Sequence, residues 1–176
     1  DKLFRAIAKG QSQFPQSLFY AGSKLQFELS SLLAHLQPII AEDAQLFVLD
    51  VHTGLGSRAQ ESLLLDGFDN DWDVKYFEKM FSAKVIQPLI TPGYYRAEGT
   101  LSLLLKKHWG AQNVHHIFQE FGTYDFKTVL RQLIRDQHMQ TRSAQEMLET
   151  YFPKDEQWLN SCSQAGLLRF SQLLQS

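Results

Sequence analysis

The chain of 176 residues is long enough for a single domain with a sizeable hydrophobic core, and its 44% of hydrophobic residues is typical of a packed protein. A formal net charge of −2 gives no reason to expect nucleic-acid or anionic-membrane binding. The single Cys162 excludes a disulfide framework within the chain. No apolar run approaches the roughly 20 residues that span a bilayer, so we expect no membrane partner and a cytoplasmic location.

Helical and strand patterns alternate along the first half of the chain. Residues 2–9 are weakly helical, and after a turn-rich connector, leucines at helical spacing predict an amphipathic helix over 24–36. A short apolar run at 45–51 is typical of a buried strand. Next come a strand at 61–65, a helix at 74–81 and a strand at 84–90.

The second half continues this alternation after a loop. We expect a helix at 101–109, a strand at 114–120, and helices at 126–138, 144–151 and 155–175, with Gly166 bending or splitting the last one. In this last helix, the apolar side chains of Leu167, Leu168 and Phe170 are predicted to be core, or alternatively an interface. Alternating strands and helices indicate a layered α/β fold.

Two predicted strands end in side chains that could bind a metal or transfer a proton. His52 follows the strand at 45–51, and Glu120 ends the strand at 114–120. If these strands are parallel neighbours, both side chains project from the same carboxyl edge of the sheet, where α/β proteins often bind ligands. Imidazole is a good zinc ligand, and a nearby carboxylate can act as a general base. Asp50 shares the side of His52 if the strand is unbroken, and could orient it.

Each of these residues also has an ordinary structural interpretation. A lone histidine after a strand is more often a capped loop residue, and a lone glutamate can simply cap a helix. His115 and His116 alternate faces, so at most one can face a site, and both are interpreted as structural. The chain has no His-Glu-x-x-His, no phosphate-binding glycine loop and no Gly-x-Ser-x-Gly elbow.

Several segments, in order along the chain, resemble a known family. LDVHTGLG is similar to the segment of the zinc carboxypeptidase superfamily in which Asp-x-His ends a core strand and supplies the last zinc ligand. EFGTY resembles the later strand end that carries the catalytic glutamate, and YRAEGTL resembles the lid that closes over the substrate. More closely, FYAGS and the tail YFPKDEQWLNSCSQAGLL are similar to a bacterial carboxypeptidase-like branch of uncharacterised metallopeptidases.

The resemblance implies a fold, a cofactor and residue roles. It implies a three-layer α/β fold with helices on both faces of a mixed, mostly parallel sheet. It further implies a zinc-dependent hydrolase acting on a peptide or N-acyl amino acid, with His52 as zinc ligand and Glu120 as general base and acid. Tyr95, or its neighbour Tyr94, would be a lid residue that binds substrate. Two more residues, Arg58 and Tyr124, lie near these motifs but receive no role.

The chain departs from the superfamily in its other zinc ligands. The superfamily takes two ligands from an upstream His-x-x-Glu and holds the substrate carboxylate with an upstream Asn-Arg pair, and neither occurs here. A catalytic zinc site normally has three protein ligands. We therefore expect residues 1–176 to be the C-terminal part of one catalytic domain, inactive alone, with a missing N-terminal segment as its partner.

Two other functions stay open. A non-catalytic binding or interaction domain that keeps the fold without the metal would explain the missing ligands. An α/β hydrolase with another mechanism, such as a serine nucleophile, is less favoured because the elbow motif is absent.

Overall fold

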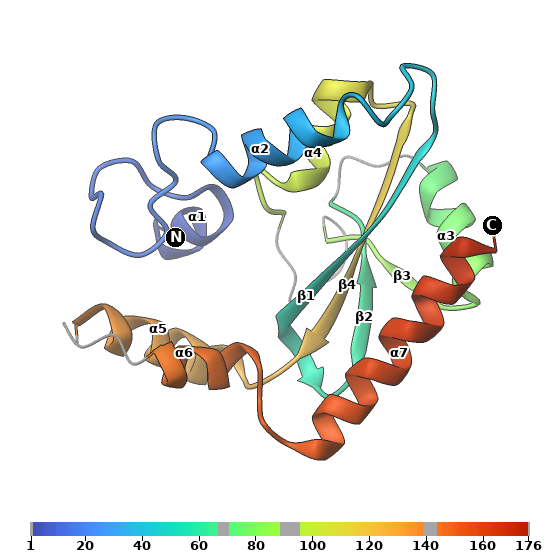
Figure 1. Cartoon of the computed structure of the whole chain (residues 1–176). Coiled ribbons are helices and arrows are strands. Elements are labelled where there is room, and N and C mark those ends of the chain that lie inside the picture. The colour runs from blue at the N-terminus through green and yellow to red at the C-terminus, as the bar shows by residue number, and fades with distance from the viewer. Residues whose placement is uncertain (1, 67–70, 89–95, 139–143, 176) are drawn as a thin grey trace. The chain divides into compact units, whose positions relative to one another are not determined.

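A computed structural model describes residues 2–66, 71–88, 96–138 and 144–175 (Figure 1). The chain divides into two compact units: residues 1–47 with 95–115, and residues 48–94 with 116–176. The expectation of one domain over residues 1–176 stays a prediction. Among the described residues, no helix is both long and apolar enough to cross a membrane.

The first unit contains three helices: α1 (Lys2–Lys9), α2 (Phe27–Leu36) and α4 (Leu101–Trp109). The prediction for α1 and α4 is confirmed at both ends, whereas α2 begins three residues later than expected. Helix α4 has clear boundary signals, because the Thr100 side chain accepts a hydrogen bond from the Leu103 N–H and Gly110, at φ 89°, follows its last residue. Lys9 forms an ion pair with Glu98, 2.6 Å between Nζ and Oε1, which joins α1 to the residues before α4.

Four strands form one mixed sheet in the order β1-β4-β2-β3. Their bounds are β1 (Leu46–Arg58), β2 (Glu61–Leu64), β3 (Val85–Ile86) and β4 (Val114–Gly122). Strand β2 pairs parallel with β3 and antiparallel with β4. Strands β1 and β4 run in the same direction: the Leu46 N–H donates to the Asn113 carbonyl near their starts, and the Thr123 N–H donates to the Gly54 carbonyl near their ends.

The length of β1 corrects one prediction. The sequence predicts a strand that ends at Val51, with His52 beginning a glycine-rich turn, but β1 continues to Arg58. The two glycines that suggest a turn, Gly54 and Gly56, lie within the strand at φ 150° and 106°. They keep the chain extended in conformations that other residues rarely adopt. His52 is therefore a mid-strand residue.

The described part of the second unit includes the helices α3 (Asp71–Phe81), α5 (Phe126–His138), α6 (Ala144–Tyr151) and α7 (Glu156–Leu174). Helix α3 contacts both α7 and β3, while α5 packs on α6. The buried core of this unit comes from α3, from the strands β3 and β4, and from β2 with the residue after it. It consists of Leu63, Leu65, Phe77, Phe81, Val85 and Ile117. The combination of helices with an open, mixed and mostly parallel sheet is consistent with the predicted three-layer α/β fold.

Helix α7 differs from its prediction in two respects. It runs unbroken through Gly166, which neither ends nor splits it. The predicted core residues Leu167, Leu168 and Phe170 are exposed, at 70%, 51% and 54%. The buried positions of α7 are instead Trp158 and Arg169. The inward face is thus defined by an aromatic ring and a guanidinium group, which a search for apolar periodicity does not detect.

Polar contacts fix α7 on the sheet. Arg169 donates from Nε to both carboxylate oxygens of Glu61 on β2, at 3.0 and 3.2 Å, and from Nη1 to the Phe81 carbonyl at 2.8 Å. Gln119 of β4 donates to the same carboxylate at 2.8 Å. At the other end of α7, Trp158 donates from Nε1 to the Gly122 carbonyl at 2.8 Å. These bonds join α7 to the end of β4, two residues beyond Glu120.

Candidate functional site

Two neighbouring strands bring together a carboxylate and two imidazoles. Alternation along β1 places Asp50 and His52 on one face, and alternation along β4 places His116 and Glu120 on one face. Asp50 lies between the histidines: His52 Nε2 is 3.0 Å from Asp50 Oδ1, and His116 Nε2 is 3.3 Å from Asp50 Oδ2. The first contact is a hydrogen bond, whereas the second is an ion-pair distance without hydrogen-bond alignment.

The contact with Asp50 defines the chemical state of His52. An ionised carboxylate only accepts hydrogen bonds, so Nε2 of His52 carries the proton. The hydrogen bond to Asp50 raises the pKa of His52, and the charge of Glu120 acts in the same direction, against a lowering by burial. In the neutral ring Nδ1 is then the nitrogen with a lone pair, and no described residue hydrogen-bonds to it. This matches the predicted orienting contact of Asp50.

Asp50 is a strongly anionic centre. Burial by itself would raise the pKa of Asp50, but the contacts from His116 and His52 outweigh burial and hold that pKa well below its usual range. The carboxylate therefore stays ionised across the physiological pH range. It can hold a histidine or stabilise a positive charge, but it is a poor proton acceptor at neutral pH.

Glu120 has the opposite character. Burial raises its pKa, against lowering contributions from the Leu55 N–H and from His52. Glu120 Oε1 accepts a hydrogen bond from the Leu55 N–H at 2.9 Å, while no described residue hydrogen-bonds to Oε2. A Cβ at Gly54 would be in ordinary van der Waals contact with Oε1, at 3.4 Å, so this carboxylate lies against the backbone of β1. Glu120 can therefore both accept and donate a proton.

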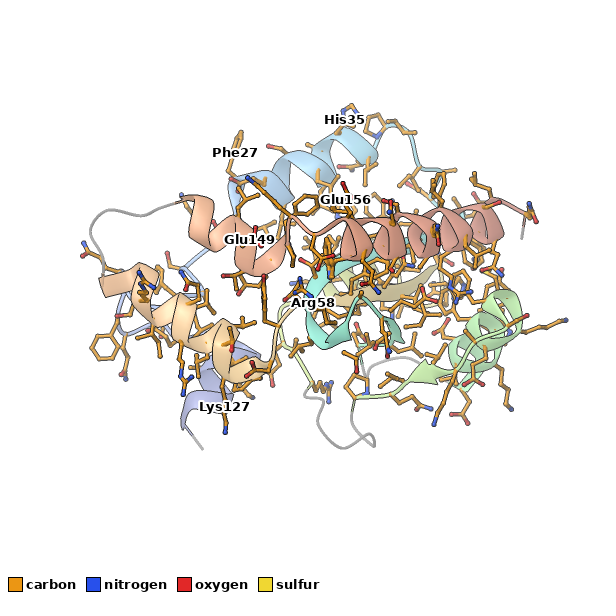
Figure 2. All side chains as sticks on the ribbon, turned by 90° about the horizontal axis from the view of Figure 1, so that it is seen from below. Phe27, His35, Arg58, Lys127, Glu149 and Glu156 are labelled. Atoms are coloured by element: carbon orange, nitrogen blue, oxygen red, sulfur yellow. The ribbon has the colours of Figure 1, made fainter. Side chains whose placement is uncertain are left out.

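Arg58 and Tyr124 do lie together, as their proximity to the two motifs suggests. The Arg58 guanidinium lies over the Tyr124 ring, 4.7 Å from its centroid. Arg58 also donates to the Thr123 carbonyl at 3.1 Å and to Asp155 at 2.7 Å. Tyr124 in turn donates to Glu149 on α6 at 3.3 Å, and Figure 2 shows Glu149 and Arg58 in this region. These contacts tie the end of β1 to α6 and to the start of α7.

A catalytic zinc site normally needs three protein ligands close together. Across residues 2–66, 71–88, 96–138 and 144–175, no three His, Cys, Asp or Glu side chains are grouped so that they could hold a metal ion. His52 has the features of a single ligand, because a carboxylate holds its far nitrogen while Nδ1 stays available. The predicted lid residue Tyr95 and its alternative Tyr94 lie outside the described residues.

His116 is the residue that sequence reasoning missed. It was interpreted as structural, yet it reaches the same carboxylate as His52. Side chains alternate between the two faces of a strand, so the sequence places His116, Phe118 and Glu120 on the same face of β4. Phe118 contacts both histidines edge-to-face, with ring centroids 5.2 Å from His52 and 4.5 Å from His116. The sequence alone could not tell which face of β4 lies beside Asp50.

These features define an α/β protein with a carboxylate–histidine cluster on adjacent parallel strands, beside a half-buried glutamate. A family model described as "Protein of unknown function (DUF2817)" matches residues 1–164, and the chain belongs to this family. No curated protein matches the chain. No solved structure matches it either.

Proposed function

We propose that this chain carries part of the active site of a zinc-dependent hydrolase of the carboxypeptidase type. His52 would be one zinc ligand, and Glu120 would be the general base and acid. The observation that carries the proposal is the placement of these two side chains on adjacent strands, with Asp50 bound to the far nitrogen of His52. The motifs that resemble the zinc carboxypeptidase superfamily supply the reaction class.

The chemistry would be divided between the metal and the protein. Zinc, when bound, acts as a Lewis acid on the scissile carbonyl and on the attacking water. Glu120 would take the proton of that water on Oε2 and pass it to the leaving amine, while the Leu55 N–H holds Oε1. Its raised pKa suits a group that must accept and then donate a proton. Asp50 would keep the ring of His52 in one orientation.

The remaining zinc ligands would come from residues outside this chain. The described residues would contribute one ligand, His52, whereas a catalytic zinc normally has three from the protein. We accordingly propose that the chain by itself is inactive and that a preceding segment of the same protein completes the site. The substrate would be a peptide or an N-acyl amino acid, with Tyr95 contacting it. A cytoplasmic location likewise stays a prediction.

A matched pair of glutamate variants tests the mechanism. In the protein expressed from its natural reading frame and loaded with zinc, Glu120→Gln is expected to lose about 10²- to 10⁴-fold in activity on benzoyl-glycyl-phenylalanine and N-acetyl amino acids. Its zinc content should be unchanged. Glu78→Gln is the control, because the Glu78 carboxylate also accepts a backbone N–H, from Val85 at 3.2 Å, away from this site. Wild-type activity of a zinc-loaded Glu120→Gln protein would refute the proposal.

A binding domain without metal is the second candidate. The observation in its favour is the same incomplete donor set. It predicts that the natural protein contains no zinc and that His52→Ala leaves its function intact. Native mass spectrometry, which reads chain mass and bound metal together, separates the two candidates directly.

A further inference from the structure

His116 is buried in an unusual way for a histidine. Its side chain is 0% exposed, and neither Nδ1 nor Nε2 has an aligned hydrogen-bond partner among the described residues. Buried polar atoms are nearly always paired, because an unpaired one costs free energy. An apolar residue of the same shape would avoid this cost. The position of His116 on β4 therefore requires an explanation beyond packing.

The surroundings of His116 point to Asp50. The imidazole stacks edge-to-face on Phe118, which fixes the plane of the ring. In that orientation Nε2 is 3.3 Å from Asp50 Oδ2, while Asp50 Oδ1 is occupied by His52. His52 thus hydrogen-bonds to one oxygen of the carboxylate, and His116 lies at ion-pair distance from the other. A carboxylate held at one oxygen can still rotate about its Cβ–Cγ bond, whereas one held at both cannot.

We propose that His116 is a positioning residue for His52, acting through the carboxylate of Asp50. His116 lies inside the protein and does not reach the solvent, whereas the His52 side chain is 48% exposed. The buried imidazole anchors the carboxylate, and the anchored carboxylate fixes the exposed ring. The role deepens the proposed function and rests on it only for metal affinity, because the anchoring itself requires no metal.

The imidazole N–H protons of the ¹⁵N-labelled chain provide the test. A ring N–H gives a resolved downfield signal only when a hydrogen bond protects it from exchange with water. In the wild type we expect such a signal for His52 Nε2–H, assigned by its loss in His52→Gln. In His116→Phe, which keeps a ring against Phe118 but removes the donor, the His52 signal should broaden beyond detection. His116→Gln, which restores a donor, should bring it back.

Control variants separate positioning from general destabilisation. His115→Gln changes the neighbouring buried histidine, which contacts Gln45 at 2.9 Å, and should leave the His52 signal unchanged. The backbone amide spectrum of each variant reports whether the fold is retained. If His116→Phe does not fold, His116→Leu is the second variant without a donor. A His52 signal that persists in a folded variant without a donor would overturn the proposal, as would its absence from the wild type.

Metal affinity distinguishes this proposal from the proposed function. In the protein from the natural reading frame, the donor-free His116 variant should bind zinc about 10- to 100-fold more weakly than wild type, measured by competition with a chelator. A wild-type protein that binds no zinc would refute the hydrolase. The ring N–H measurement would still decide the positioning role of His116.

Discussion

Gly122 is expected to be one of the most sensitive positions of the chain. It belongs to the EFGTY motif, and a Cβ built there would lie 2.5 Å from the Gly56 carbonyl oxygen and nearer still to that of Ser57. Both atoms are backbone atoms of β1. The N–H of Gly122 donates to the Gln60 carbonyl at 3.2 Å, and the Gly122 carbonyl accepts from the Ala59 N–H at 3.0 Å. The end of β1 and Gly122 therefore cannot move apart without losing these bonds.

Gly122→Ala should therefore behave as an overpacking substitution. Such changes cost about 1–3 kcal/mol, and we expect the upper part of this range because backbone must move. For a chain of this length each kcal/mol lowers the melting temperature by roughly 2–4 °C. We predict a drop of about 4–12 °C, measured by thermal unfolding and, independently, by the urea midpoint.

The same substitution at Gly166 is the internal control. Gly166 lies within α7, and an added Cβ there meets no atom within 4 Å. Alanine is favoured over glycine in a helix by about 1 kcal/mol, so Gly166→Ala should raise the melting temperature by roughly 2–4 °C. The fall at Gly122 would follow from close approach, and the rise at Gly166 from helix propensity in open space. A Gly122→Ala protein as stable as wild type would refute the reasoning.

Two further predictions concern ion pairs. Arg169→Met should lose about 3 kcal/mol of unfolding free energy, measured in urea, because the Glu61 carboxylate, 21% exposed, loses its charged partner and keeps only the hydrogen bond from Gln119; recovery in the double variant with Glu61→Leu checks this cause. In the site, the hydrogen bond to Asp50 raises the pKa of His52 above the unfolded-state value of 6.5. The contact therefore stabilises the fold fully below pH 6.5, and this stabilisation is lost as the pH rises through the folded-state pKa. An NMR titration should show a lower pKa for His52 in Asp50→Asn, and an unchanged value would contradict the contact.

Local signals predicted the helices well. Helix α4 has a threonine cap before it and a glycine after it, and its predicted ends are confirmed. The bounds of α5 and α6 are confirmed too. Helix α2 starts late because Gln26 has extended backbone, at φ −62° and ψ 147°, although the leucine spacing begins earlier. Periodicity shows that a helix exists but not where its first turn closes.

The sequence misled where tertiary contacts replace a local rule. Glycines usually mark turns, but Gly54 and Gly56 lie within a strand, at φ 150° and 106°, conformations that other residues rarely adopt. Apolar residues usually mark the core, but α7 turns Arg169 inward and Leu167 outward. The reason for that choice is Glu61, 108 positions away in the sequence, which no local window includes.

The site was predictable in its pairs but not as a whole. The two-residue spacing of Asp50 and His52 predicts their contact, and the structure contains it. The place of Glu120 beside the same strand required the strand order, which enters the sequence-based prediction only as a condition. The contact of His116 depends on which face of β4 meets β1, and the alternation of side chains leaves both choices open.

The hydrogen bond between α7 and β4 also gives the protein a spectroscopic reporter. Trp158 is 1% exposed and donates to the carbonyl of Gly122, whereas Trp72 is 50% exposed. The buried indole of Trp158 should fluoresce at short wavelength. Its emission maximum should shift to longer wavelength when water reaches the end of β4. Because that end lies two residues from Glu120, the emission of a protein with Trp72→Phe and Trp109→Phe, in which Trp158 is the remaining tryptophan of the chain, would follow whether the strand that carries the glutamate is in place.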